Sequence, residues 1–162
     1  MKKARLAPLA LIALASLSVA LAPVASANGR PLQATMVGAN EVPGPGDIDG
    51  TGTVKLRLNQ GRHRICYKIE VADITLPATA AHIHPGAVGE ANPPVVVLGT
   101  PDATGLAEGC VTDVERSLIK AIRKHPAQYY VNVHTTDFPD GAIRGQLGKW
   151  APGAGSGADD ED

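Results

Sequence analysis

The sequence has few aromatic residues, no excess of basic charge and, after its first 27 residues, no long apolar run. Phe, Trp and Tyr make up 3% of the 162 residues, which leaves little surface on which sugars or nucleotide bases could stack. Lys and Arg number 15 against 16 Asp and Glu, so no electrostatic footprint for an anionic partner is present. We therefore expect no nucleic-acid partner.

Motifs of several enzyme classes are also missing. Ser117 has no G-x-S-x-G context, which argues against serine hydrolysis. No glycine-rich motif that would cradle a phosphate is present. The two cysteines, Cys66 and Cys110, fit neither CxxC redox nor zinc spacing. We therefore predict no catalytic residues and interpret the chain as non-enzymatic, with copper redox activity left as an alternative.

The two ends of the chain differ from its middle. Three basic residues precede the apolar run "LAPLALIALASLSVALAPVA" and a small-residue "ASA", which predicts a signal peptide over residues 1–27. Its removal leaves 12 basic residues against 16 acidic ones, a net charge of −4. Residues 28–149 then form one domain, and 150–162 a disordered acidic tail rich in Gly and Ala. The expected location is secreted, extracellular or periplasmic, without membrane insertion after signal removal.

An exported chain with two cysteines is expected to pair them. A disulfide between Cys66 and Cys110 would contribute about 3–4 kcal/mol in the chain-entropy model. Alternation in "RICYKIEV" places Ile65 and Ile69 inward and Cys66 on the opposite face. The disulfide should therefore staple a sheet surface or edge.

Short segments that alternate with period two, separated by Gly/Pro turns, predict an all-β protein of the immunoglobulin-like or Greek-key β-sandwich class. The expected strands are 32–37, 53–58, 64–71, 79–84, 95–98, 129–135 and 142–147. The apolar run 95–98 suits a strand covered on both faces. One amphipathic helix is expected at about residues 114–124, capped by Asp113 and ended by Pro126.

The segment "FPDGA" predicts a tight C-terminal hairpin with Pro139 and Asp140 at the turn and positive φ at Gly141. Closing it with Phe138 opposite Ala142 gives one polar and one apolar face. The polar face carries Asn132, His134, Thr136, Arg144 and Gln146, and the apolar face Val131, Val133, Ile143 and Leu147.

"AAHIHPG" places His82 and His84 on one face of a strand, and His134 lies on a polar face as well. If the two strands are neighbours, the three imidazoles form a site for copper or zinc. Carboxylates on predicted loops that would complete such a site are Glu41, Glu90, Asp137 and Asp140. His63 and His125 have the character of surface residues.

The competing interpretation is a polar network. Asn132, Thr136, Arg144 and Gln146 donate or accept hydrogen bonds, as neutral histidine does. Such residues would fix the register of the strands without binding a ligand. The sequence leaves both interpretations open.

Several motifs resemble one family. "ATAAHIHPGAVGEANPPVVVL", "GCV" and "YYVNVHTTDFPDGAIRGQL" are similar to the CHRD domain, named for the repeats of chordin, and suggest a small exported bacterial member. The resemblance spans about residues 32–147 and implies a secreted β-sandwich. Its motif maps onto His82, His84, Asn132, His134, Arg144, Gly145 and Gln146. The cysteine-rich modules of chordin are missing, so growth-factor binding is not carried over.

The leading hypothesis is an exported, non-enzymatic CHRD binding module that holds copper or zinc through His82, His84 and His134. Asn132, Thr136, Arg144 and Gln146 would support these ligands. The first alternative is a structural, adhesion or protein-interaction module with an extracellular or envelope protein as its partner. The second is a small copper enzyme similar in architecture to superoxide dismutase.

Overall fold

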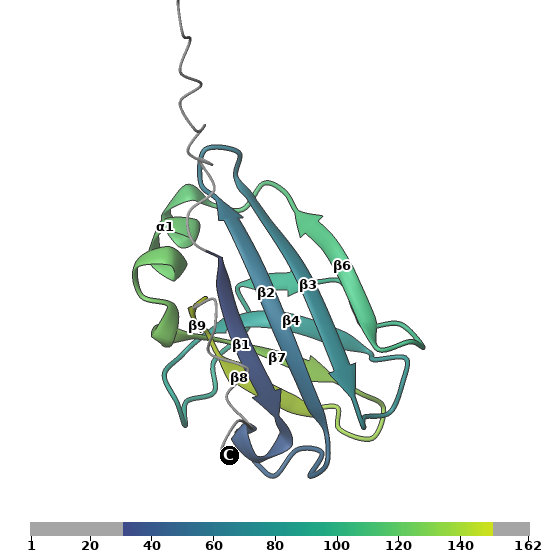
Figure 1. The fold of residues 1–162 in the computed structure, drawn as a ribbon. Helices are drawn as coiled ribbons and strands as arrows, with labels where there is room; N and C mark the ends of the chain where they lie inside the picture. The colour runs from purple at the N-terminus through teal and green to yellow at the C-terminus, as the bar shows by residue number, and fades with distance from the viewer. Residues whose placement is uncertain (1–30, 151–162) are drawn as a thin grey trace, which may run out of the picture.

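The described residues form an antiparallel β-sandwich with one α-helix along its side (Figure 1) and the short 3-10 helices η1 (Gly38–Asn40) and η2 (Pro126–Gln128). The computed structural model describes residues 31–150, so the expected signal peptide and the tail beyond Trp150 lie outside the described residues. The strands are β1 (Leu32–Val37), β2 (Thr51–Asn59), β3 (Arg64–Ala72), β4 (Ala80–Pro85), β5 (Val96–Leu98), β6 (Leu106–Val111), β7 (Tyr129–His134), β8 (Ile143–Gln146) and β9 (Gly148–Lys149). The helix α1 spans Arg116–Lys124.

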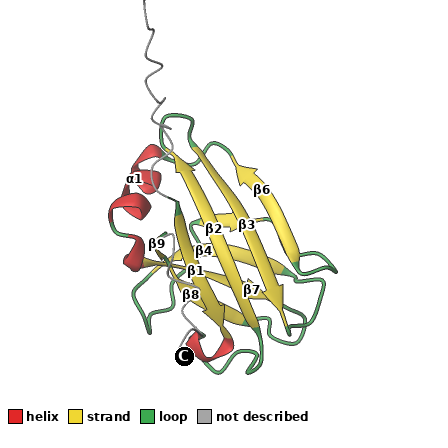
Figure 2. Ribbon diagram, viewed as in Figure 1, coloured by secondary structure: helices red, strands yellow, loops and turns green. Residues whose placement is uncertain are grey.

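The strands form one sheet that folds over into two layers. Their order is β5-β4-β7-β8-β1-β2-β3-β6, with β9 paired to β1. The layer of β1, β2, β3 and β6 lies in front of the layer of β4, β7 and β8 (Figure 2). The layers join where Val37 of β1 pairs with Arg144 of β8. The predicted all-β sandwich is confirmed.

The core lies between the two layers and follows the predicted alternation. In β2, Val54, Leu56 and Leu58 are buried. The rear layer contributes a matching apolar face, made of Ala81, Ile83, Val131, Val133 and Ile143. Burial of this aliphatic surface is the main favourable contribution to folding.

The helix differs from the prediction at its first turn. Asp113 has a positive φ of 59°, and the Val114 N–H donates to the backbone oxygen of His63. These contacts hold the segment outside the helix, which begins at Arg116 without a side-chain cap. Asp113 is therefore not the N-cap, and Ile119 and Ile122 form the buried stripe.

Two strands near the edges were predicted poorly. Val97 of β5 is 66% exposed, so this strand is covered on one face only. Strand β6 was missed because its inward positions include the small residues Ala107 and Gly109, which give no apolar signal. A Cβ on Gly109 would lie 2.7 Å from the Tyr67 hydroxyl oxygen, so the ring of Tyr67 fills the space that a larger residue would need.

The C-terminal hairpin has a longer loop than predicted. Asn132 pairs with Arg144, and Tyr130 pairs with Gln146, a register four residues away from the tight hairpin. The turn at Pro139 and Asp140 exists, closed by the Gly141 N–H to the Phe138 oxygen, but it lies inside the loop. The shift is even, so the residues of β7 and β8 keep their predicted polar and apolar faces, whereas Thr136 lies in the loop beyond β7.

A disulfide links the two cysteines as expected. Cys66 of β3 and Cys110 of β6 are directly opposite, with Cα atoms 3.9 Å apart. The bond lies on the outer face of the front layer and holds the terminal strand β6 to β3. The predicted surface staple is confirmed.

Candidate metal site

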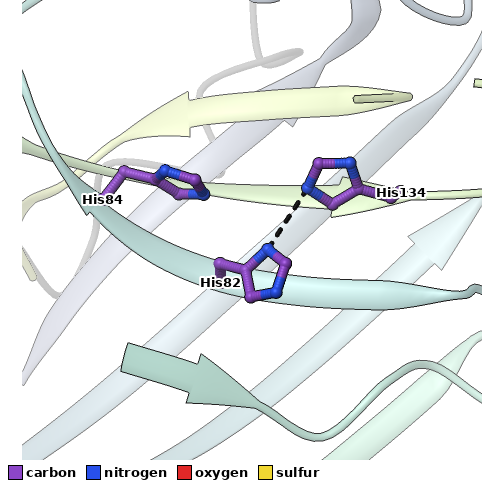
Figure 3. A group of neighbouring side chains, drawn as sticks. All are labelled: His82, His84 and His134. Atoms are coloured by element: carbon purple, nitrogen blue, oxygen red, sulfur yellow. Dashed lines mark hydrogen bonds between the residues drawn. The ribbon is translucent and has the colours of Figure 1, made fainter. Parts of the chain in front are cut away.

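Three histidines converge on the outer face of the rear layer. In the β4–β7 pair, His82 is opposite Asn132 and His134 is opposite Ala80, so the two imidazoles are diagonal neighbours. Within the described residues, His82, His84 and His134 each offer a ring nitrogen within 4.8 Å of the others. Figure 3 shows the three rings gathered over β4 and β7.

Backbone carbonyls fix two of the three rings. His84 Nδ1 lies 2.6 Å from the Asn92 oxygen, and His134 Nδ1 lies 2.9 Å from the Pro139 oxygen. A carbonyl only accepts, so both Nδ1 atoms carry the proton and donate. In the neutral rings, both Nε2 atoms therefore hold a free lone pair.

The third ring faces one of these lone pairs. His82 Nδ1 lies 3.3 Å from His134 Nε2 (Figure 3). Since His134 Nε2 accepts, His82 donates through Nδ1 in the neutral pair. A cation placed between the rings would need His82 to carry its proton on Nε2 instead.

Burial keeps two of the rings neutral. Desolvation lowers the pKa of His82, and the neighbouring His134 and His84 lower it further. Desolvation also lowers the pKa of His84, although its contacts to Asn92 and Asn132 oppose this shift. Both rings are therefore neutral at pH 7, the state in which imidazole binds a metal ion.

The remaining polar residues hold a loop over this face. Arg144 Nη2 donates to the Ala87 oxygen at 3.1 Å. Gln146 Nε2 donates to the oxygens of Gly86 at 2.6 Å and Ala127 at 2.9 Å. These bonds draw the loop 86–92 onto the sheet and bring the Asn92 carbonyl to His84.

Tyr130 connects the loop contacts with the histidines. Its ring stacks on His84 with centroids 4.7 Å apart, and the Arg144 Cζ lies 3.4 Å from its centroid. Strand β7 lies between β4 and β8, so His84 and Arg144 approach Tyr130 from neighbouring strands on either side. This stack restricts the orientation of His84.

The profile of the CHRD domain matches residues 32–147. The chain belongs to the CHRD family. No curated protein and no solved structure matches it. Within residues 31–150 of this CHRD chain, no helix has the length and apolar character needed to cross a membrane.

Two buried nitrogens on this face of the CHRD domain are unpartnered. His84 Nε2, Arg144 Nη1 and the Asn132 oxygen Oδ1 make no hydrogen bond of normal geometry among the described residues, although the Asn132 side chain lies close enough to His84 to oppose the fall in its pKa. A buried polar atom without a partner costs about 1–3 kcal/mol. His84 belongs to a group of three histidines whose ring nitrogens lie within 4.8 Å of one another, so a shared metal ion would remove this cost for its Nε2.

Some predicted residues of the CHRD domain lie elsewhere. Thr136 is exposed in the 135–142 loop and does not face Arg144, because the hairpin register differs by four residues from the predicted one. Within the described residues, no carboxylate joins the histidine group. The carboxylates considered from the sequence, Glu41, Glu90, Asp137 and Asp140, therefore lie outside the group. They were candidates because predicted loops often carry ligands.

Glu41 has a separate environment in this domain. It is 6% exposed, and a Cβ on Gly141 would lie 2.5 Å from its carboxyl carbon. Burial raises the pKa of Glu41 to about 7, against the opposing effects of the Arg144 charge and the Val42 N–H. This carboxyl is a buried packing element beneath the 135–142 loop.

Sequence reasoning missed three partners in the CHRD site: Tyr130, the Asn92 carbonyl and the Pro139 carbonyl. Tyr130 shares the strand parity of Asn132 and His134, a signal that could have placed it on the polar face. The carbonyls carry no sequence signal. Gly145 of the motif has a backbone role, because a Cβ there would lie 2.2 Å from the Thr35 oxygen of β1.

Proposed function

We propose that this CHRD chain is an exported, non-enzymatic binding module that holds a transition metal ion, zinc or copper, between His82, His84 and His134. The ligand atoms are His84 Nε2, His134 Nε2 and His82 Nδ1. The observation that carries the proposal is the buried, unpartnered Nε2 of His84 in a group whose three histidines each offer a ring nitrogen within 4.8 Å of the others.

The spacing of the nitrogens suits a tetrahedral ion. Zinc–imidazole bonds of about 2.0–2.1 Å separate two ligands of a tetrahedron by about 3.3–3.4 Å. His82 Nδ1 and His134 Nε2 are 3.3 Å apart, which supports zinc or copper(I) over square-planar copper(II). His84 is fixed by Asn92 and Tyr130, so the less buried rings of His82 and His134 adjust to the ion.

The polar network supports this function instead of competing with it. Metal-bound histidines commonly donate their second ring N–H to a carbonyl, which fixes the tautomer and the ring orientation. Asn92 and Pro139 supply such carbonyls to His84 and His134. Arg144 and Gln146 hold the loop that contains Asn92.

Export is part of the proposal. The basic and apolar N-terminal segment predicts a signal peptide, and a Cys66–Cys110 disulfide is typical of an oxidising compartment. His82 and His134 are half-buried, which leaves a fourth coordination position on the solvent side for water or for a ligand of a partner protein.

Calorimetric titration of the exported chain with Zn²⁺, Cu⁺ and Cu²⁺ tests the proposal. The native protein should bind one ion, and the His82→Ala/His84→Ala/His134→Ala variant should bind none. His125→Ala is the matched control, because His125 is exposed outside the cluster, and it should bind as the native protein does. Equal binding by the native and triple-variant proteins, or none by either, would refute the metal site.

A second candidate function is a protein-interaction module in which the histidines only stabilise the sheet. The anchored loop 86–92 favours it, because Val88 at its tip is 83% exposed. In this case His84→Ala lowers the unfolding free energy by about 1–3 kcal/mol with no metal binding to lose. The copper-enzyme alternative requires superoxide or peroxide turnover by the copper-loaded protein above that of free copper.

A further inference from the structure

The outer face of the front layer carries an exposed disulfide in a charged groove. The groove has a volume of about 450 Å³, and its lining includes Cys66, Cys110, Lys55, Arg57, Lys68 and Glu108. Three cationic side chains and one carboxylate therefore line the same groove as the disulfide. This site lies on the opposite layer from the histidines and is independent of the proposed metal function.

The two sulfurs of the disulfide are in different environments. Cys110 belongs to β6, the last strand of the sheet, and is exposed, whereas Cys66 is half-buried on β3 between β2 and β6. Arg57 of β2 is directly opposite Cys66. A thiol from solution therefore reaches the Cys110 sulfur first. Cys66 is the cysteine that has Arg57 as its cross-strand neighbour.

The charge of Arg57 is not neutralised by a neighbouring carboxylate. Lys68 pairs with Glu70 at 2.7 Å, and Lys55 lies directly opposite Lys68, an arrangement of like charges that costs stability. Arg57 has no ion pair among the described residues. Its charge is therefore available to stabilise an anion formed on the Cys66 sulfur.

We propose that Cys66–Cys110 is a thiol-exchange site for small anionic thiols, with Cys110 as the attacked sulfur and Cys66 as the leaving group. A thiolate forms a new S–S bond to Cys110 Sγ as the Cys66–Cys110 bond breaks, and Cys66 departs as a thiolate. No net oxidant is required, because the lone pair of the attacking thiolate forms the new S–S bond and the Cys66 sulfur keeps the electron pair of the bond that breaks.

Two features of the groove favour attack on Cys110 with Cys66 as the leaving group. A leaving thiol with a lower pKa departs faster, and an adjacent arginine lowers the pKa of a cysteine thiol. Lys55 and Arg57 also attract an anionic thiol over a cationic one, an effect that salt weakens. The product is a mixed disulfide on Cys110 and a thiolate on Cys66.

The test is the reaction of the folded, full-length exported chain with glutathione, which is anionic, and with cysteamine, which is cationic. The reaction is stopped in acid at low conversion, the free thiol is alkylated with N-ethylmaleimide, and both cysteines are mapped by mass spectrometry. Most of the glutathione should be on Cys110 and most of the maleimide on Cys66.

Arg57→Gln is the test variant and Arg62→Gln, an exposed arginine of the β2–β3 turn, is its control. Arg57→Gln should slow the glutathione reaction by about threefold and the cysteamine reaction by less, while Arg62→Gln should change neither. Adducts mainly on Cys66, no adduct on the folded protein, or equal rates for the two variants would each overturn the proposal.

Discussion

The two layers of the sandwich have outer faces of similar sequence pattern and very different environments. Arg144 on the rear face is 2% exposed, held by the Ala87 carbonyl and the Tyr130 ring. Arg57 on the front face alternates with apolar residues in the same way and is exposed. The difference is the loop 86–92, which covers the rear face, whereas no segment of residues 31–150 covers Arg57.

This comparison shows how a loop changes the chemistry of a sheet face. Solvated charges on the front face have little effect on their neighbours beyond a Debye length of about 8–10 Å. Under the loop, His84 loses solvent, its pKa falls, and the Asn92 carbonyl orients its ring. The covered face is suited to binding an ion through fixed nitrogens, and the open face to reactions with solutes.

The largest predicted effect concerns the open face. Replacing Cys66 and Cys110 together by serine should lower the unfolding free energy by about 3–4 kcal/mol, because the disulfide closes a loop across a sequence separation of 44 residues. Urea denaturation measures the loss. Zinc affinity of the folded variant should not change; a drop would mean that the two faces are coupled.

The covered face should show an unusual pH dependence. The pKa of His82 and of His84 is lowered from an ordinary value of 6.5. Their contribution to the free energy of unfolding is therefore complete above pH 6.5 and is lost as the pH falls. The pKa of Glu41 is raised from 4.5 to about 7. Its contribution to the free energy of unfolding is therefore complete below pH 4.5 and is lost as the pH rises. As the pH rises from 4.5 to about 7, stability is gained from the two histidines and lost from Glu41, so the two contributions oppose each other.

The variant Glu41→Gln separates these contributions. Its unfolding free energy should rise relative to the native protein between pH 5 and pH 8, by up to about 3 kcal/mol at 1.4 kcal/mol per pKa unit. Denaturation at several pH values measures this difference. A constant difference across the range would show that Glu41 does not titrate near neutrality in the folded protein.

A smaller effect is expected at the loop anchor. Gln146→Ala leaves loop carbonyls unpaired and should cost about 1–3 kcal/mol, and it should weaken zinc binding by about tenfold through the Asn92 contact to His84. Gln33→Ala, on the outer side of β1, is the matched control and should stay within about 0.5 kcal/mol. Equal effects of the two variants would show that the loop does not depend on its anchor.

Much of this arrangement could be predicted from the sequence. Strand alternation identified the buried and outer faces, and the parity of His82, His84 and His134 placed all three on polar faces. The hairpin register was wrong by four residues, yet the faces were right because an even shift preserves them. The individual cross-strand pairs of the tight hairpin, such as Thr136 with Arg144, were wrong, because Arg144 pairs with Asn132 and Gln146 pairs with Tyr130.

The remaining features depend on contacts between distant segments. Pairing of β4 with β7, which brings His82 beside His134, joins segments about 50 residues apart and has no local signal. The carbonyls of Asn92 and Pro139 are backbone groups, and no residue type encodes them. The first turn of the helix followed the Val114 contact to His63 instead of the capping preference of Asp113.

The central claim is that His84 and His134 present Nε2, with Nδ1 protonated, toward a common ion. Long-range ¹H–¹⁵N correlation of the imidazole rings, recorded at pH 7.5 before and after one equivalent of Zn²⁺, tests it most directly. We predict Nδ1–H tautomers for both rings without metal, and with zinc a shift of the Nε2 signals of His84 and His134 and of the Nδ1 signal of His82. Nε2–H tautomers, or spectra that zinc leaves unchanged, would contradict the account.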